Sequence, residues 1–414
     1  MIKKILLFFL LYMYLLSPTF AIISIPSSII IFAFVGLVYF LRNKYLTITA
    51  YSIYVLLFFL FLSLYSGLIQ LTLSDIDVAN SNLIFLKIMI NNAMYLLFGI
   101  MLLSTIMKSE DISLFLKMIV LVVFINSILI IIASLFPEVK NFLESILSQD
   151  YDSNLDYANG FRARGLAAAG GFSLSALGIV TCIVCVFLCT NKKITSFQTF
   201  ISILVITVSQ IFIARTGLYF CIAIFISWYI YSIIFTKNRL FLITTSLIGF
   251  SILIISFDSY SDKLAGVLSW AFELFNNISS GSGVHTNSTD DLLTMFNVPS
   301  DLVRIIFGFG FYEADVSYRS DSGFVRSLYS VGLFSIFIYL FHAYFLCKKL
   351  PENYRLYKNM FMLMFVLLFI LEIKGPVFYQ NYTARFLFIL YAFFLVGKNK
   401  YQNSCYNVSE SIRN

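Results

Sequence analysis

Long apolar runs separated by short polar segments organise this chain up to about residue 397. Runs of roughly 18 or more apolar residues recur, and each is long enough to cross a bilayer as an α-helix. A β-barrel would instead show alternating segments of about ten residues. The pattern predicts an all-α polytopic membrane protein that forms a single integral membrane domain over residues 1–414.

About twelve transmembrane helices follow from these runs. They are predicted over residues 5–20, 24–41, 46–70, 84–107, 112–135, 172–190, 195–213, 218–235, 240–256, 324–346, 359–372 and 384–397. Lysine and arginine lie in nearly all the short loops of one side, which predicts that these loops, the N-terminus and the C-terminal tail 398–414 are cytoplasmic. The first run resembles a signal peptide, but a second run follows at once and favours an uncleaved span.

Two long polar segments lie on the predicted outer side, at about residues 136–171 and 257–323. In the second, residues 264–275 and 291–307 have helical periodicity that suits helices lying on the membrane surface. Between them, residues 276–289 have the Gly, Ser and Asn composition of a flexible linker. Most of the polar residues outside the membrane are therefore expected to lie in these two outer, periplasmic loops.

The composition excludes several classes of protein and several kinds of site. The chain is 60% hydrophobic and only 12% charged, which excludes a soluble domain. Its net charge of +7 is explained by the basic residues of the loops, which set the orientation of the chain in the membrane. No nucleic-acid partner is therefore expected. Cys182 and Cys185 lie within a span without a nearby histidine or acid, which favours helix packing over a redox or metal pair. No metal and no cofactor are expected.

Several basic residues break the positive-inside pattern, because they lie at span ends on the predicted outer side. They are Arg162, Arg164, Arg215, Arg304, Arg319, Arg326, Lys374 and Arg385. They come from four separate outer segments, so they are candidates for convergence on one anion. Guanidinium groups offer forked donors to phosphate oxygens, which suits a lipid with a diphosphate head. Pairing with acids or contact with lipid headgroups is the alternative for any single arginine.

Two acidic residues lie near the same outer side. Asp321 is close to Arg319 and Arg326, so it is expected to orient an arginine or to act as a base toward a sugar hydroxyl. Glu372 ends a predicted span and is expected to form an ion pair with Lys374. The outer side is therefore expected to carry carboxylates as well as arginines.

Three stretches carry a resemblance to a known family. They are FRARGLAAAGGFSLS, SQIFIARTGLYF, and FGFGFYEADVSYRSDSGFVRSLYSVGLFSIFIYLF at the close of the long outer loop. In this order, over roughly residues 110–395, the chain resembles the bacterial O-antigen or capsule repeat-unit polymerases of the Wzy type, which are distant relatives of the O-antigen ligases.

The resemblance implies a membrane glycosyltransferase fold of the GT-C-like type in the bacterial inner membrane. It implies metal-independent transfer of a growing glycan from undecaprenyl diphosphate to the non-reducing end of a lipid-linked repeat unit, at the periplasmic face. A chain-length regulator protein is the implied protein partner, beside membrane lipid. Arg215 is the first candidate for the leaving diphosphate, with Arg162, Arg164, Arg319 and Arg326 as helpers. Asp321 and Glu372 are the candidate catalytic carboxylates.

Three other functions stay open. An O-antigen ligase would usually carry a histidine at the end of the large loop, where this chain has Ser320, Asp321 and Ser322. A repeat-unit flippase would show internal repeats and spans broken at mid-membrane, and no convincing repeat is visible. In a structural or sensory membrane protein, the outer arginines would be incidental.

Overall fold

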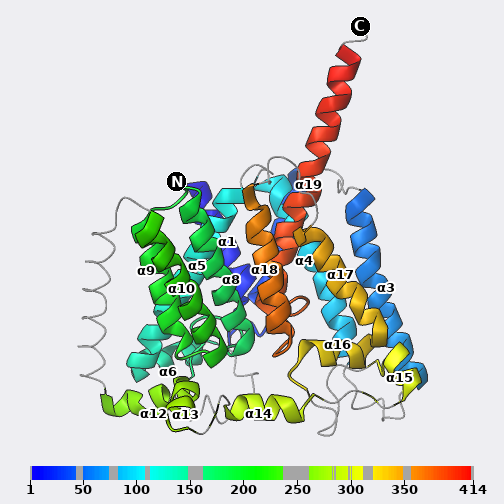
Figure 1. Cartoon of the computed structure of the whole chain (residues 1–414). Helices are drawn as coiled ribbons and strands as arrows, with labels where there is room; N and C mark the ends of the chain where they lie inside the picture. The colour runs from blue at the N-terminus through cyan, green and yellow to red at the C-terminus, as the bar shows by residue number, and fades with distance from the viewer. Residues whose placement is uncertain are drawn as a thin grey trace. The chain divides into compact units, whose positions relative to one another are not determined.

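The computed structural model describes most of the chain and divides it into two compact units. The described residues are 2–42, 50–73, 83–107, 112–147, 162–235, 261–281, 283, 286–296, 299, 301–310, 320–347 and 356–411. Unit 1 comprises Met1–Leu7, Ile29–Ile112 and Ser288–Asn414, and unit 2 comprises Phe8–Ser28 and Ser113–Asn287. Figure 1 shows the helices with their labels.

Helices make up the framework of unit 1. They are α2 (Ser27–Arg42), α3 (Ala50–Leu73), α4 (Ile84–Thr105), α14 (Asn287–Thr294), α15 (Leu302–Phe307), α16 (Gly323–Val331), the 3₁₀ turn η2 (Gly332–Phe334), α17 (Ser335–Cys347), α18 (Lys358–Glu372) and α19 (Asn381–Ser411). Helix α4 packs against both α3 and α19, and α17 packs against α18. The core of this unit is therefore a layer of apolar helices centred on α4.

Unit 2 is also built from helices. They are α5 (Ile112–Leu135), α6 (Pro137–Ile146), α8 (Phe172–Thr190), α9 (Ser196–Gln210), α10 (Arg215–Phe235), α12 (Ser261–Ala271) and α13 (Glu273–Ser279), together with most of α1 (Ile2–Leu16). Helices α8, α9 and α10 pack against one another in all three pairs. Thr195 and Gln198 form a reciprocal capping box that fixes the start of α9.

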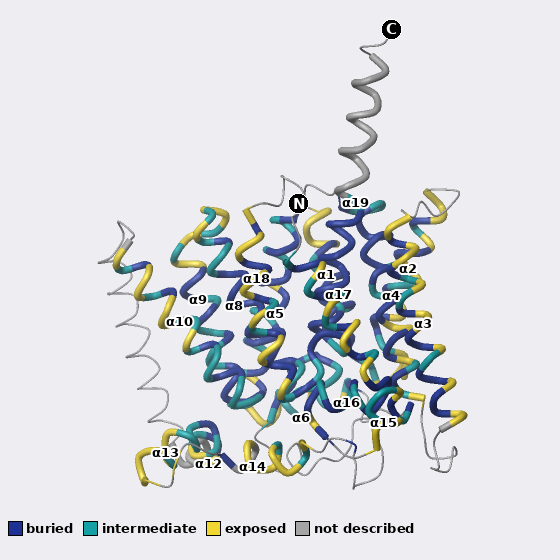
Figure 2. Tube along the Cα trace, turned by 45° about the vertical axis from the view of Figure 1, so that its right-hand side comes forward, coloured by how far each residue is buried: buried dark blue, intermediate teal, exposed yellow. Residues whose placement is uncertain are grey.

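Six helical segments of the described chain are long and apolar enough to cross a membrane. They are Ala50–Thr72, Ile84–Thr105, Ile112–Leu135, Phe172–Thr190, Arg215–Ile234 and Gly323–Cys347. Figure 2 shows exposed residues along α3 and α10, where large apolar side chains such as Leu64 (66% exposed) and Ile230 (51% exposed) face outward. Apolar side chains exposed along such helices suit contact with lipid. In the described ranges the only β structure is two isolated bridges, so the prediction of an all-α membrane protein is confirmed at this level.

The predicted span 324–346 corresponds to the spanning segment Gly323–Cys347, but the structure interrupts this segment with a 3₁₀ turn. Helix α16 ends at Val331, and η2 separates it from α17. Gly332 has a φ of 60°, and a Cβ on it would lie 2.6 Å from the backbone nitrogen of Gly308. Phe309 N donates to the carbonyl of Tyr329 at 2.6 Å, and Gly310 N donates to that of Ser330 at 3.1 Å. The Gly308-Phe-Gly310 stretch thus ties the loop to the break through close backbone contact.

The long polar segments contain more helix than their composition predicts. Helix α6 begins with Pro137, because proline suits the first turn of a helix. This helix lies inside the predicted loop 136–171. Helices α12 to α15 bear out the helical periodicity of residues 264–275 and 291–307, each stretch being divided into two helices. The linker prediction for 276–289 is wrong at both ends, because α13 extends to Ser279 and α14 starts at Asn287. The predicted span 240–256 lies outside the described residues.

Candidate functional site

Arg215, the first residue of α10, is held by a carboxylate and by an aromatic ring within unit 2. Its guanidinium forms an ion pair with Glu273 at the start of α13, and both side chains are largely buried, at 11% and 18% exposed. The same guanidinium carbon lies 4.9 Å from the ring centre of Trp270. A cation in this position is attracted by the ring face as well as by the carboxylate.

Arg162 reaches the same tryptophan from a distant part of the sequence. Its guanidinium carbon lies 5.4 Å from the ring centre of Trp270. Arg162 and Arg215 are close enough to repel each other electrostatically. Two guanidinium groups therefore lie close to one aromatic ring, and one of them is paired with a carboxylate. We call the four residues Arg162, Arg215, Trp270 and Glu273 the arginine centre.

Helix α10 fixes the position of the tryptophan and the carboxylate. The hydroxyl of Tyr219, one turn after Arg215, donates to the carbonyl of Ala271 at 2.9 Å. Its ring meets that of Phe275 edge to face, with 5.6 Å between the ring centres. In Figure 1, α12 and α13 lie at the end of α9 and α10 where the chain turns from one helix into the other. Helices α12 and α13 are thereby docked on the start of α10 within unit 2.

A glycine allows the start of α10 to approach its neighbours. A Cβ on Gly217 would collide with the side-chain oxygens of Ser175 on α8 and Gln210 on α9. Ser175 and Gln210 are both buried. In the Arg-Thr-Gly stretch, Gly217 lets α10 pack closely against α8 and α9 because it has no side chain. This close packing fixes the direction of Arg215 at the start of α10.

Asn126 of α5 holds the segment that carries Arg162. Its Nδ2 donates to the carbonyl of Arg164 at 3.3 Å, and its Oδ1 accepts from the backbone N–H of Leu166 at 3.0 Å. The hydroxyl of Tyr12 also donates to this Oδ1, at 3.3 Å. Gly165 has a φ of 62°, and a Cβ there would lie 3.0 Å from the side-chain carbon of Asn126. One buried amide thus fixes a turn that only glycine enters easily.

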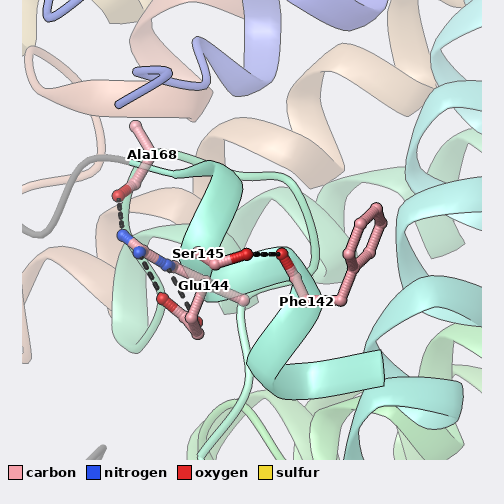
Figure 3. A network of polar contacts seen from close by, with 5 residues as sticks. Phe142, Glu144, Ser145 and Ala168 are labelled. Atoms are coloured by element: carbon pink, nitrogen blue, oxygen red, sulfur yellow. Dashed lines mark hydrogen bonds and ion pairs between the residues drawn. The ribbon is translucent and has the colours of Figure 1, made fainter. Parts of the chain in front are cut away.

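Arg164 has internal partners for its guanidinium. Figure 3 shows Glu144 and Ala168 in this network: Arg164 Nη2 donates to Glu144 Oε2 at 2.5 Å, and Nη1 donates to the carbonyl of Ala168 at 2.8 Å. Its Nε donates to Glu144 Oε1 at 3.3 Å, which completes a bidentate pair with a side chain only 7% exposed. Arg164 therefore connects α6 to the 162–168 segment through these hydrogen bonds.

In unit 1, Arg326 and Asp321 form a second group. Arg326 Nη2 lies 3.4 Å from Asp321 Oδ1, and its Nε donates to the carbonyl of Ser320. Asp321 is 57% exposed at its side chain, whereas Arg326 is 13% exposed. The aspartate is placed to orient the arginine, the first of the two roles expected for it. Arg319 lies outside the described residues.

Glu372 is fully buried in unit 1 and accepts three hydrogen bonds. The donors are the backbone N–H of Val377 at 2.8 Å, the backbone N–H of Phe378 at 3.3 Å, and the hydroxyl of Tyr339 at 3.2 Å. Gly323, at the start of α16, packs directly against the carboxylate. The carboxylate thereby fixes the turn between α18 and α19 beside the helix that carries Arg326.

The sequence did not single out Asn126, Glu144, Trp270 or Glu273. Trp270 is one of two tryptophans in the chain and lies in a stretch of predicted helix, which is the one signal that marks it. Among the described residues no group of three or more His, Cys, Asp and Glu side chains could hold a metal ion.

No protein-family model, no curated protein and no solved structure matches this chain.

Proposed function

We propose that the chain is a surface-polysaccharide polymerase, a glycosyltransferase that works on glycans linked to undecaprenyl diphosphate. The observation that carries this proposal is the arginine centre, in which Arg162 and Arg215 meet at Trp270 with Glu273 as the counter-ion. Two guanidinium groups placed close together offer forked donors that suit the oxygens of a diphosphate. The motif resemblance supplies the choice of glycan chemistry.

In the proposed reaction, a hydroxyl of the acceptor repeat unit attacks the anomeric carbon that joins the growing glycan to its carrier. A new glycosidic bond forms as the bond from that carbon to the phosphate oxygen breaks. The hydroxyl proton passes to a base, and undecaprenyl diphosphate leaves with an added negative charge. Arg215 and Arg162 stabilise this developing charge, which is the largest contribution such a site makes.

The remaining candidates take supporting roles in this proposal. Arg164 is assigned to hold the 162–168 segment through Glu144. Asp321, the more exposed carboxylate, orients Arg326 and is the candidate that reaches an acceptor hydroxyl. Glu372, fully buried, is proposed to position rather than to deprotonate.

The proposed setting is the bacterial inner membrane, with about twelve spans, both ends cytoplasmic and the two long segments periplasmic. A GT-C-like arrangement, a partner that regulates chain length, and independence from metal belong to the same proposal. Six apolar helices of spanning length among the described residues support the membrane location.

Gene deletion tests the function directly through the lipopolysaccharide profile on a gel. Loss of the polymerase leaves a single repeat unit on the lipid core, whereas loss of a ligase or flippase removes the glycan altogether. A normal ladder would overturn the proposal. In a complemented strain, Arg215→Ala is expected to insert at normal levels and to abolish long chains, and wild-type chains from that variant would refute the role of Arg215.

A further inference from the structure

A second arginine in unit 1 lies between two tyrosines, within the packed pair of helices α4 and α19. The guanidinium carbon of Arg385 lies 5.4 Å from the ring centre of Tyr95 and 5.9 Å from that of Tyr382. Arg385 is partly exposed, so its position is reachable from outside the helix pair. An ionisable side chain within apolar helices is costly and commonly marks a functional site.

The contacts between α4 and α19 show how the two helices are aligned. Phe85 near the start of α4 meets Tyr379, with 6.0 Å between the ring centres, and Tyr95 meets Phe388 at 6.5 Å. Further along, a Cβ on Gly99 would lie 2.8 Å from the Cβ of Ala392. Both helices therefore run in the same direction in a fixed register.

This register places Asn92 beside Arg385. Asn92 precedes Tyr95 by three residues and follows Phe85 by seven, so all three lie on the face of α4 that packs against α19. Along α4, Asn92 lies between Phe85, which contacts Tyr379, and Gly99, which contacts Ala392. Along the facing chain, Tyr382 and Arg385 lie between the same two contacts.

Asn92 is fully buried, and within the described part of the chain neither its Oδ1 nor its Nδ2 has a hydrogen-bond partner. A buried polar atom without a hydrogen-bond partner destabilises the fold relative to a satisfied one. A leucine of similar size would avoid this cost, so the amide calls for an explanation. The next residue, Asn91, is exposed.

The chemistry of the side chains defines the class of ligand. Arg385 favours an anion with several acceptor oxygens, and Asn92 Nδ2 can donate to the same group. Asn92 Oδ1 requires a donor, which a bare phosphate diester lacks and a hydroxyl supplies. By helix rise, Asn92 lies about 12 Å along α4 from its start and Arg385 about 6 Å along α19 from its start.

We propose that Asn92, Tyr95, Tyr382 and Arg385 form a binding site for a phosphate ester that carries a neighbouring hydroxyl group. Two sources supply this chemistry: the glycerol headgroup of phosphatidylglycerol and the glycosyl diphosphate of a lipid-linked sugar. The site lies within unit 1 and consists of residues other than the arginine centre. It stands whether or not the chain is a polymerase.

The test measures binding to the full chain in phosphatidylcholine nanodiscs. The probes are dioctanoyl phosphatidylglycerol, farnesyl diphospho-N-acetylglucosamine, and dioctanoyl phosphatidylmethanol, which keeps the phosphate but has no hydroxyl. At least one of the first two should raise the melting temperature and bind at least tenfold tighter than the third. Whichever of the two binds identifies the source. Equal binding of all three, or binding of none, would overturn the proposal.

Matched variants separate ligand binding from packing. Asn92→Leu should fold, because it removes two unsatisfied atoms, and it should lose at least tenfold in affinity for the bound probe. Arg385→Lys keeps the charge without the planar fork and should also bind at least tenfold more weakly. Asn91→Leu, on the exposed side of the same helix, should bind like the unmodified chain. Unchanged affinity in both Asn92→Leu and Arg385→Lys would refute the site.

Discussion

Arg215 and Glu273 form an ion pair that joins the first residue of α10 to the first residue of α13, beside the ring of Trp270. Arg162 lies beside the same ring, so a second guanidinium group is close to this ion pair. Under the proposed function, a diphosphate would compete with Glu273 for Arg215. The charge of Glu273 should therefore affect how strongly these residues attract an anion.

Neutralising that carboxylate should strengthen anion binding. Glu273→Gln retains the shape and a hydrogen-bond acceptor but removes the negative charge, so the affinity for inorganic pyrophosphate is expected to rise several-fold. Titration calorimetry on the purified chain measures it. Glu138→Gln is the matched control, since Glu138 is an exposed carboxylate of α6 outside the arginine centre and its change should leave the affinity unchanged. Weaker binding in Glu273→Gln would mean that the charge is needed to hold Arg215 in place.

The arginines illustrate what the sequence can and cannot predict. Arg162, Arg164 and Arg215 stand out because a cation is unexpected at outer span ends, and that argument needs only loop charge. Loop charge does not distinguish Arg162 from Arg164, which lies two residues later. In the structure, Arg162 lies beside the ring of Trp270, whereas Arg164 forms an ion pair with Glu144. Side-chain partners depend on which elements meet, and Glu144 and Glu273 lie in helices α6 and α13 whose docking no local pattern encodes.

The spans show the same division. Apolar length alone predicts α5 and α8 with the observed bounds, because a continuous apolar run permits little else. The break at Gly332 was missed, since a glycine inside an apolar helix is common and the break depends on the backbone of Gly308 from a different segment. Tertiary contact, rather than local propensity, ends that helix.

Arg162 and Arg164 should respond differently to truncation. Arg162→Ala is expected to weaken pyrophosphate binding at least tenfold with little change in melting temperature. Arg164→Ala leaves Glu144 and the carbonyl of Ala168 without their donor, and should lower the free energy of unfolding by about 1–3 kcal/mol. Thermal melting and calorimetry on both variants give the comparison. A stable Arg164→Ala protein that binds no pyrophosphate would reverse the two assignments.

Glu372→Gln should act on stability before it acts on chemistry. The glutamine amide can keep its oxygen toward Val377 N and Phe378 N and turn its N–H₂ group toward Tyr339 Oη, which then accepts instead of donating. Because the backbone N–H groups lose a charged acceptor, a loss of about 1 kcal/mol is expected, similar to that for Tyr339→Phe. Chain length in vivo, normalised to folded protein, is the second measurement. A stable Glu372→Gln protein without long chains would instead make this carboxylate a direct participant in catalysis.

Gly217→Ala should disturb the packing that aims Arg215. The added methyl group would collide with the side-chain oxygens of Ser175 and Gln210, which belong to two different helices. Overpacking of this kind costs about 1–3 kcal/mol, and the displaced start of α10 should also shorten the glycan chains. Thermal melting and the gel ladder measure both effects.

Two further variants decide whether the collision is the cause. Gly266→Ala, in α12, meets nothing within 4 Å and should be neutral or stabilising by up to about 1 kcal/mol, because alanine is the better helix former. Adding Ser175→Ala to Gly217→Ala removes one of the two colliding oxygens and should recover part of the lost stability and chain length. If the double variant is no better than Gly217→Ala alone, the close approach of α8 to α10 does not aim Arg215.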